Sequence, residues 1–185
     1  MTRFEARLVK LLGEKPRLLA LVRPMFVARR ALRRQHAVLH RMVLGIVRSD
    51  TVCRRLLSVP GVGAVVVLTY VTGVDDPARF GHARDLGPHF GLTPRKYASG
   101  EIDRNGPITK AGDGAVSKAL SQAALSLLTR VERWSALKAW GMAVAKRRGL
   151  RRAVIAVARK LAIVMHRTWV DGTTFNWSRE ADATA

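Results

Sequence analysis

Ser99 stands in a segment whose composition suits phosphoryl-transfer chemistry. It lies in the run Y-A-S-G-E-I-D-R-N-G-P-I-T-K-A-G-D, residues 97–113, a basic stretch punctuated by glycines. A serine hydroxyl attacks a phosphate only when a base or metal takes its proton and cations hold the developing charge. Gly100 would let the backbone and a phosphate approach closely. The side chains expected to supply the cations are Arg95, Lys96, Arg104 and Lys110.

A second segment, L-S-V-P-G-V-G-A over residues 57–64, is typical of a helix-hairpin-helix turn. Pro60 ends the preceding helix, and glycines at 61 and 63 permit backbone angles that a side chain would forbid. A helix that begins at Ala64 presents free N–H groups and a positive dipole end, where a phosphate oxygen binds well. Gly61, Val62 and Gly63 are therefore predicted to contact phosphate, although a plain helical turn with a glycine cap is the alternative.

The charge of the chain favours a nucleic-acid partner. Its 185 residues carry a formal net charge of +20, and the excess of cations is concentrated in residues 1–48 and 129–170. Each phosphate that a protein neutralises releases counterions, so such a surface binds nucleic-acid backbones. A solvated basic surface is the alternative. No apolar run is long enough to span a bilayer and no signal peptide is recognisable, so we expect a cytoplasmic protein with no membrane partner.

The sequence predicts no metal site. Cys53 is the only cysteine, so neither an intramolecular disulfide nor a cysteine-based metal cage can form, and we expect this residue to be a small buried hydrophobe. The five histidines have no metal-ligand spacing. The carboxylates of the central region fall in loops or caps, without the spacing of a two-metal site.

Periodicity predicts a mainly α-helical architecture. A long amphipathic helix is expected over residues 17–48, with an apolar seam made of Leu18, Val22, Met25, Leu32, Leu39, Met42 and Ile46. Such a seam indicates either a coiled coil with another subunit or packing against the same chain. Residues 49–91 are predicted to form short helices around the hairpin, and residues 92–112 an ordered loop, since no segment alternates convincingly enough for a strand. Three further helices are expected. The first is capped by Asp113 and has one apolar face, made of Val116, Leu120, Ala123, Ala124, Leu127 and Leu128. The other two are expected over about residues 134–147 and 150–169.

These elements indicate three regions. Residues 1–48 form a basic, coiled-coil-like helical arm, residues 49–177 form a helical domain that contains the helix-hairpin-helix motif, and residues 178–185 form a flexible tail. The chain after Asp171 is expected to be frayed.

Several blocks together resemble a known family. They are V-C-R-R-L-L-S-V-P-G-V-G-A-V-V-V-L-T-Y, D-D-P-A-R-F, and L-G-P-H-F-G-L-T-P-R-K-Y-A-S-G-E-I-D-R-N-G-P-I-T-K-A-G-D, with R-W-S-A-L-K-A-W and A-R-K-L-A-I-V-M-H-R-T-W-V-D-G-T downstream. The combination resembles the C-terminal transposase domain of the DEDD insertion-sequence recombinases (the IS-one-ten family). The resemblance covers nearly the whole chain.

The resemblance implies DNA transposition through a divided active site. Ser99 matches the family's nucleophile, which links covalently to a DNA end, and a structured guide RNA encoded by the element is an implied partner. An N-terminal RuvC-like domain would carry four metal-binding carboxylates. We expect the chain to lack that domain, so no cofactor is expected here and Mg²⁺ is expected there. The helical arm is expected to mediate homo-oligomerisation.

One departure from the family affects the predicted site. Many relatives have arginine early in the helix after G-D, where this chain has Ser117 followed by Lys118. Lys118 can replace the charge at a phosphate but not the bidentate geometry of arginine. Two functions therefore stay open: a serine-bearing transposase domain, inactive without the carboxylate domain, or a non-catalytic basic helix-hairpin-helix module that binds DNA or RNA.

Overall fold

The structure is a computed structural model that describes residues 3–99 and 102–177. The predicted tail, residues 178–185, lies outside the described residues. The described chain is mainly α-helical, as expected, and it divides into an N-terminal unit, Met1–Gly45, and a C-terminal unit, Ile46–Ala185. We describe the two units separately.

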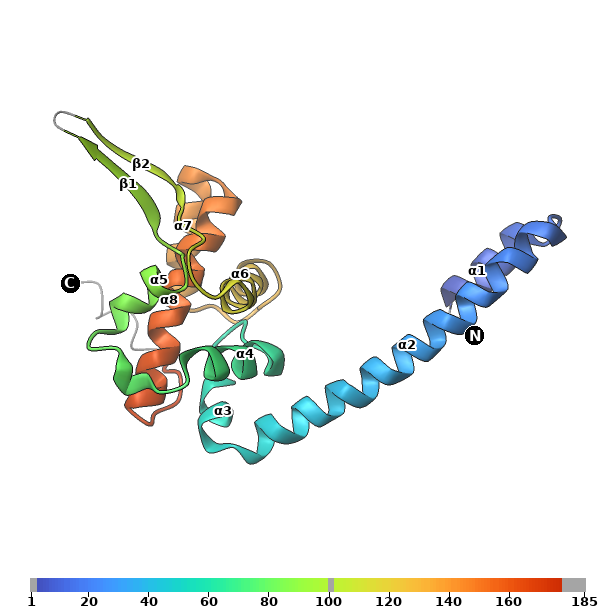
Figure 1. Cartoon of the computed structure of the whole chain (residues 1–185), viewed down its shortest axis with the longest axis horizontal. Helices are drawn as coiled ribbons and strands as arrows, with labels where there is room; N and C mark the ends of the chain where they lie inside the picture. The colour runs from blue at the N-terminus through green and yellow to red at the C-terminus, as the bar shows by residue number, and fades with distance from the viewer. Residues whose placement is uncertain (1–2, 100–101, 178–185) are drawn as a thin grey trace. The chain divides into compact units, whose positions relative to one another are not determined.

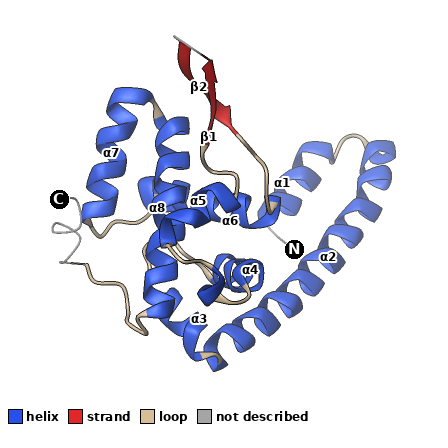
Figure 2. Ribbon diagram, turned by 60° about the vertical axis from the view of Figure 1, so that its left-hand side comes forward, coloured by secondary structure: helices blue, strands red, loops and turns tan. Residues whose placement is uncertain are grey.

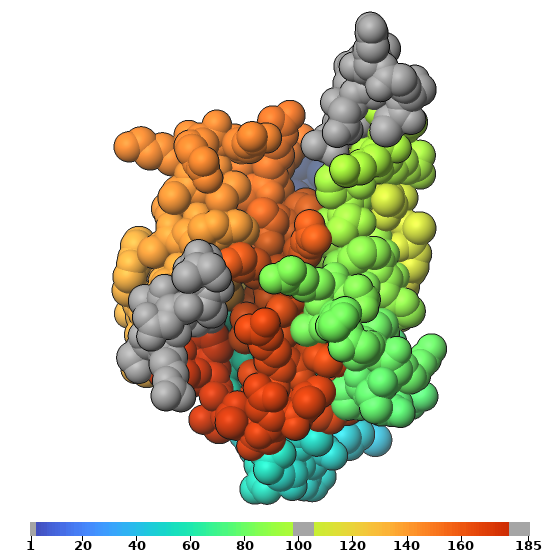
Figure 3. Space-filling view, turned by 90° about the vertical axis from the view of Figure 1, so that its left-hand side faces the viewer, coloured from blue at the N-terminus to red at the C-terminus, as the bar shows by residue number. Residues whose placement is uncertain are grey.

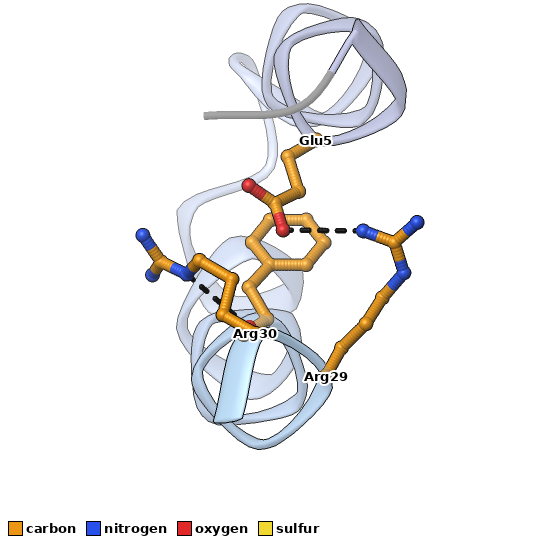
Figure 4. Close-up of polar contacts among 4 residues, drawn as sticks. Glu5, Arg29 and Arg30 are labelled. Atoms are coloured by element: carbon orange, nitrogen blue, oxygen red, sulfur yellow. Dashed lines mark hydrogen bonds and ion pairs between the residues drawn. The ribbon is translucent and has the colours of Figure 1, made fainter. Parts of the chain in front are cut away.

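Two helices make the N-terminal unit: α1 (Arg3–Leu12) and α2 (Pro16–Ser49). The second confirms the helix expected over residues 17–48, and it continues through Pro24. The two helices pack around Phe26, which is buried, and around Glu5, whose exposed fraction is only 1%. A guanidinium nitrogen of Arg29 lies 3.3 Å from the Glu5 carboxylate (Figure 4). This ion pair ties the start of α1 to the middle of α2.

The apolar seam of α2 is largely exposed. Among its predicted members, Met25 is 67%, Leu32 71% and Leu39 61% exposed. Within the N-terminal unit, α1 therefore leaves these three side chains uncovered.

The C-terminal unit is assembled around one long helix, α8 (Leu150–Val170). It packs against α3 (Thr51–Leu56), α5 (Leu86–His89), α6 (Gly114–Thr129) and α7 (Ala136–Arg148), while α4 (Ala64–Val74) packs against α6 (Figures 1 and 2). Two short 3-10 turns, Pro77–Arg79 and Ala83–Asp85, connect α4 to α5. In the core, the Tyr70 hydroxyl donates to the Ala162 carbonyl at 2.8 Å.

Helix α6 forms as its sequence predicts. The Asp113 carboxylate caps it by accepting from the amides of Ala115 at 2.7 Å and Val116 at 3.3 Å. Every residue of the predicted apolar face is buried: Val116, Leu120, Ala123, Ala124, Leu127 and Leu128. The prediction of this helix, its cap and its face is therefore confirmed.

The expectation of a loop without strands over residues 92–112 is wrong. Strands β1 (Pro94–Ser99) and β2 (Ile102–Ile108) form an antiparallel hairpin with a register irregularity between Pro94 and Lys96. The hairpin projects from the helical unit (Figures 1 and 2). Residues 94–97 are all exposed, so neither face of β1 needs a run of apolar side chains. The hairpin is held by backbone pairing, and the alternation that identifies a half-buried strand is missing.

The expectation of fraying after Asp171 is also wrong for residues 171–177. Phe175 is buried, and its amide donates to the Ser58 hydroxyl at 2.7 Å. The guanidinium of Arg133, in the connection between α6 and α7, lies 4.1 Å from the centroid of the Trp177 ring. This extended segment is therefore fixed to both the α3–α4 turn and the connection before α7.

Candidate functional site

The first part of the site is the pair of helices α3 and α4 with the turn between them. Asp50 caps α3 by accepting from the Cys53 amide at 2.7 Å, and this hydrogen bond holds the pKa of the Asp50 carboxyl below its usual value. Cys53 is buried as predicted, and burial raises the pKa of its thiol to about 11. The cap and the buried thiol fix α3 against the unit.

The turn itself has the geometry of a type II β-turn over residues 59–62. The Val62 amide donates to the Val59 carbonyl at 3.2 Å, with Pro60 and Gly61 as the central residues and φ +80° at Gly61. A type II turn requires a positive φ at its third residue. A Cβ on Gly61 would also lie 2.5 Å from the Ala123 carbonyl oxygen. Gly61 is therefore fixed by both its backbone angle and the close approach of α6.

Gly63 differs from Gly61 and corrects the interpretation of the motif. Its φ of −106° is accessible to any residue, and a Cβ there would meet nothing within 4 Å. Gly63 occupies the N-cap position of α4 but has no side chain to accept a hydrogen bond, and in the described residues no acceptor reaches the amides of residues 64–66. The Val62 amide is already bonded within the turn, and the Val62 side chain is buried. The free donors therefore lie beyond the turn, in the first turn of α4.

The second part of the site is the β-hairpin that carries Ser99. Ser99 is the last residue of β1 and pairs with Ile102 of β2, at the end of the hairpin away from the helices. Gly100 lies outside the described residues, and the structure does not describe the side chains of Ser99 and Arg104. The backbone pairing places Arg104 opposite Tyr97, and the Tyr97 ring covers Gly106.

The described cations of this region are all exposed. Arg95 and Lys96 lie on β1, and Arg95 donates to the Thr109 carbonyl at 3.3 Å. Lys110 follows β2 with a φ of +53°, which is uncommon for a residue with a side chain. Lys118 is exposed on the first turns of α6, while Ser117 beside it is half-buried. The structure thus brings Arg95, Lys96 and Lys110 to one hairpin and places Lys118 on the helix that follows it.

The base of the hairpin is held against α5 by close backbone contacts. The Lys110 amide donates to the Gly91 carbonyl at 3.2 Å, and the Thr109 amide donates to the Thr93 carbonyl at 2.9 Å. A Cβ on Gly112, where φ is +111°, would lie 1.9 Å from the His89 carbonyl oxygen. These contacts fix the direction in which the hairpin leaves the unit.

A Mg²⁺ site does not fit the residues that the structure describes. Within residues 3–99 and 102–177, no three His, Cys, Asp or Glu side chains come together as metal ligands. Across the same residues, no helix has the length and apolarity that crossing a membrane requires.

Sequence reasoning did not select two groups of candidate contacts. One is the position of the free amides: the sequence predicted free N–H groups at a helix beginning at Ala64, but assigned the phosphate contact to Gly61, Val62 and Gly63 rather than to residues 64–66. The other is a group of five exposed cations in the turn between α7 and α8, visible in the sequence as K-R-R-G-L-R-R over residues 146–152.

Comparison with known proteins places this site in a family. Residues 53–140 match the family described as Transposase IS116/IS110/IS902. These residues include most of α3 and all of α4, the β-hairpin and α6, so the match spans both parts of the candidate site.

Three curated relatives agree with this match. The protein y4pF/y4sB of Sinorhizobium fredii, provisionally named a transposase, is 30% identical over 191 residues, which cover all of this chain and 48% of the relative. The transposase for insertion sequence element IS1111A of Coxiella burnetii is 32% identical over 65% of this chain and 33% of its own length. The transposase for IS1328 of Yersinia enterocolitica is 30% identical over 69% of this chain and 38% of its own length.

The site and the matches together define a basic helical domain of the transposase class. The chain carries a transposase domain of the IS116/IS110/IS902 family, and the resemblance drawn from its motifs is confirmed at this level. The chain spans about half of the length of the first relative and about a third of the others.

Proposed function

We propose that the chain serves DNA transposition as a domain that binds DNA backbone and carries the nucleophilic serine. Family membership supports a role in transposition, and the formal net charge of +20 supports binding to a polyanion. The observation that carries the binding proposal is the uncapped start of α4, where the amides of residues 64–66 have no acceptor among the described residues. We interpret α3, the turn and α4 as a helix-hairpin-helix element on this ground.

The nucleophile we propose is Ser99. The position of Ser99 at the end of a projecting hairpin suits attack on a large substrate, because a duplex cannot enter a deep cleft. Arg95, Lys96 and Lys110 are exposed on the same hairpin and its base, about 10 Å or more along the strands from Ser99, so they can bind the DNA backbone that leads to the serine. In this reaction the serine oxygen bonds to phosphorus, the bond from phosphorus to the leaving 3′ oxygen breaks, and the released serine proton passes to a base.

The base and the ligands of the catalytic Mg²⁺ are proposed to be residues other than those that the structure describes. The resemblance assigns them to the four carboxylates of a RuvC-like domain, and no group of ligands in the described residues replaces them. By the same resemblance, a structured guide RNA would supply the sequence specificity that backbone contacts lack.

A second copy of the chain is the proposed partner of the exposed seam on α2. Leu18, Leu21, Met25, Leu32, Leu39 and Met42 follow the alternating three- and four-residue spacing of a heptad repeat, with Ala28 and Gln35 at the two intervening positions. All six apolar side chains are exposed by 45% or more. A seam of this period is the interface of a coiled coil.

The alternative function is a module that binds DNA or RNA without chemistry, favoured by the substitution of arginine by Ser117 and Lys118. Binding and chemistry can be tested separately. Titration of the full chain against unrelated duplexes should show little sequence preference and a steep loss of affinity with salt. A strong preference for one duplex with a flat salt response would contradict backbone binding. If binding behaves as proposed but no serine adduct forms when the carboxylate domain of a relative and Mg²⁺ are supplied, the non-catalytic alternative holds.

A further inference from the structure

Five exposed cations lie in and beside the turn that joins α7 to α8. They are Lys146, Arg147, Arg148, Arg151 and Arg152. Among the residues that the structure describes, none of the five forms an ion pair. The sequence between Arg133 and Val170 contains no aspartate or glutamate, so neither helix supplies a compensating charge.

The placement of these charges opposes the stability of the fold. Lys146, Arg147 and Arg148 end α7, where cations suit the negative end of the helix dipole. Arg151 and Arg152, however, lie in the first turn of α8, where the dipole disfavours positive charge and no acidic residue offsets it. The five like charges also repel one another across seven residues. An anion bound at this turn would offset both the repulsion among the five cations and the unfavourable dipole at the start of α8. The five side chains are exposed, so they do not contribute to the packing of the core.

The turn lies at the same end of the C-terminal unit as the β-hairpin. Figures 1 and 2 show α7 and α8 meeting at the end from which the hairpin projects, and Figure 3 shows the orange surface of this turn beside the green hairpin. Residues 146–152 include no aromatic side chain. The turn is therefore suited to phosphate contact rather than to stacking on unpaired bases.

We propose that the α7–α8 turn is a second contact surface for the phosphate backbone of duplex DNA, beside the hairpin that carries Ser99. The proposal rests on the proposed DNA-binding function and adds a site to it. A duplex engaged by the hairpin would continue across Arg148, Arg151 and Arg152, so that these side chains position the DNA relative to the serine.

Removal of two charges tests the surface. The variant Arg151→Gln/Arg152→Gln should bind a 30-base-pair duplex about tenfold more weakly, and the slope of log affinity against log salt should fall by about two. Its melting temperature should rise, because the first turn of α8 loses charges that its dipole disfavours. A matched control, Arg79→Gln/Arg84→Gln, removes two exposed charges from the segment between α4 and α5 and should lose about threefold or less.

Two outcomes separate this inference from the function on which it rests. If the unaltered chain fails to bind any duplex, the proposed function fails. If the unaltered chain binds, the proposal of a second surface is wrong in either of two cases. In one, Arg151→Gln/Arg152→Gln binds as tightly as the unaltered chain. In the other, it binds no more weakly than the control Arg79→Gln/Arg84→Gln. Loss of binding together with a lower melting temperature would also overturn the proposal, because it would show a structural role for the two arginines.

Crosslinking checks the location and the type of nucleic acid. Cys53 is buried with a raised thiol pKa, so a cysteine introduced by Arg148→Cys can be labelled selectively with a photoreactive group. The labelled protein should crosslink to duplex DNA, while the same label at Arg84→Cys should crosslink several times less. Equal crosslinking from both positions would contradict the site. Crosslinking to an RNA duplex but not to DNA would contradict the choice of ligand.

Discussion

At the scale of single residues, the two glycines of the α3–α4 turn have different roles. Gly61 has a positive φ and no room for a Cβ against α6, whereas Gly63 has an ordinary φ and open space. The sequence pattern G-V-G suggested one role for both, because it cannot show which glycine faces protein and which faces solvent.

We predict that Gly61→Ala and Gly63→Ala separate folding from binding. The first should lower the free energy of unfolding by about 2 kcal/mol or more, since the positive φ disfavours a side chain and the added Cβ would clash with the Ala123 carbonyl oxygen. The second should change stability by less than about 0.5 kcal/mol but weaken duplex binding by about fivefold, the worth of one hydrogen bond. Chemical denaturation and fluorescence anisotropy measure the two effects. Equal binding by Gly63→Ala and the unaltered chain would rule out close phosphate approach at α4.

A pH dependence is expected at Asp50. The pKa of its carboxyl is lowered by the hydrogen bond from the Cys53 amide, so the ionised form contributes stability above the ordinary value of 3.8. That contribution is lost as the pH falls through the lowered pKa. At pH 6, Asp50→Ala should cost about 1 kcal/mol, as loss of an N-cap does.

Denaturation at several pH values checks this expectation. The stability difference between the unaltered chain and Asp50→Ala should shrink as the pH falls below 3.8. Asp50→Asn, which keeps a capping oxygen but does not titrate, serves as the control, and the stability difference between Asp50→Asn and Asp50→Ala should stay constant through that range. A difference between the unaltered chain and Asp50→Ala that stays constant with pH would contradict the role of the ionised cap.

At the scale of elements, the sequence predicted helices better than the hairpin. The long helix α2, the capped helix α6 and the start of α8 followed from apolar periodicity, caps and breakers, which are local signals. The hairpin could not be predicted in this way, because its exposed residues carry no alternation and its base is fixed by contacts of Lys110 and Thr109 with residues 91–93. The ordered conformation of residues 171–177 was also not predicted, because it depends on contacts with Ser58 and Arg133, which are distant in sequence.

The seam of α2 should control oligomeric state. Leu32→Ser/Leu39→Ser removes two apolar side chains that are 71% and 61% exposed in the single chain, so the fold of the unit should persist while self-association weakens. Loss of two buried leucines from a coiled-coil interface costs about 2 kcal/mol or more each. Light scattering and analytical ultracentrifugation of the full chain should show a shift towards the monomer.

A control for this prediction lies elsewhere on the same helix. Arg33→Ser/Arg41→Ser alters two exposed positions outside the heptad seam and should leave the oligomeric state unchanged. A monomeric unaltered chain, or equal association by both variants, would contradict a coiled coil through this seam.

At the scale of the whole molecule, two features matter: the high positive charge and the proposed separation of the nucleophilic serine from the metal-binding carboxylates. The family and the charge were predictable from sequence, because motifs and composition carry them directly. The location of the charge was not, since only the fold shows that residues 146–152 lie at the same end of the C-terminal unit as the hairpin. A nucleophile on this domain and carboxylates elsewhere would also keep the reaction from starting until the parts assemble on DNA.

The measurement that tests the central claim most directly is the detection of a serine–DNA adduct. The full chain is incubated with labelled duplex DNA, Mg²⁺, the element's RNA and a carboxylate-bearing domain from a relative, and covalent products are separated under denaturing conditions. The account predicts an adduct whose mass places the nucleotide on Ser99, absent in Ser99→Ala and retained in the control Ser117→Ala. An adduct that persists in Ser99→Ala would contradict it, because another group would then be the nucleophile.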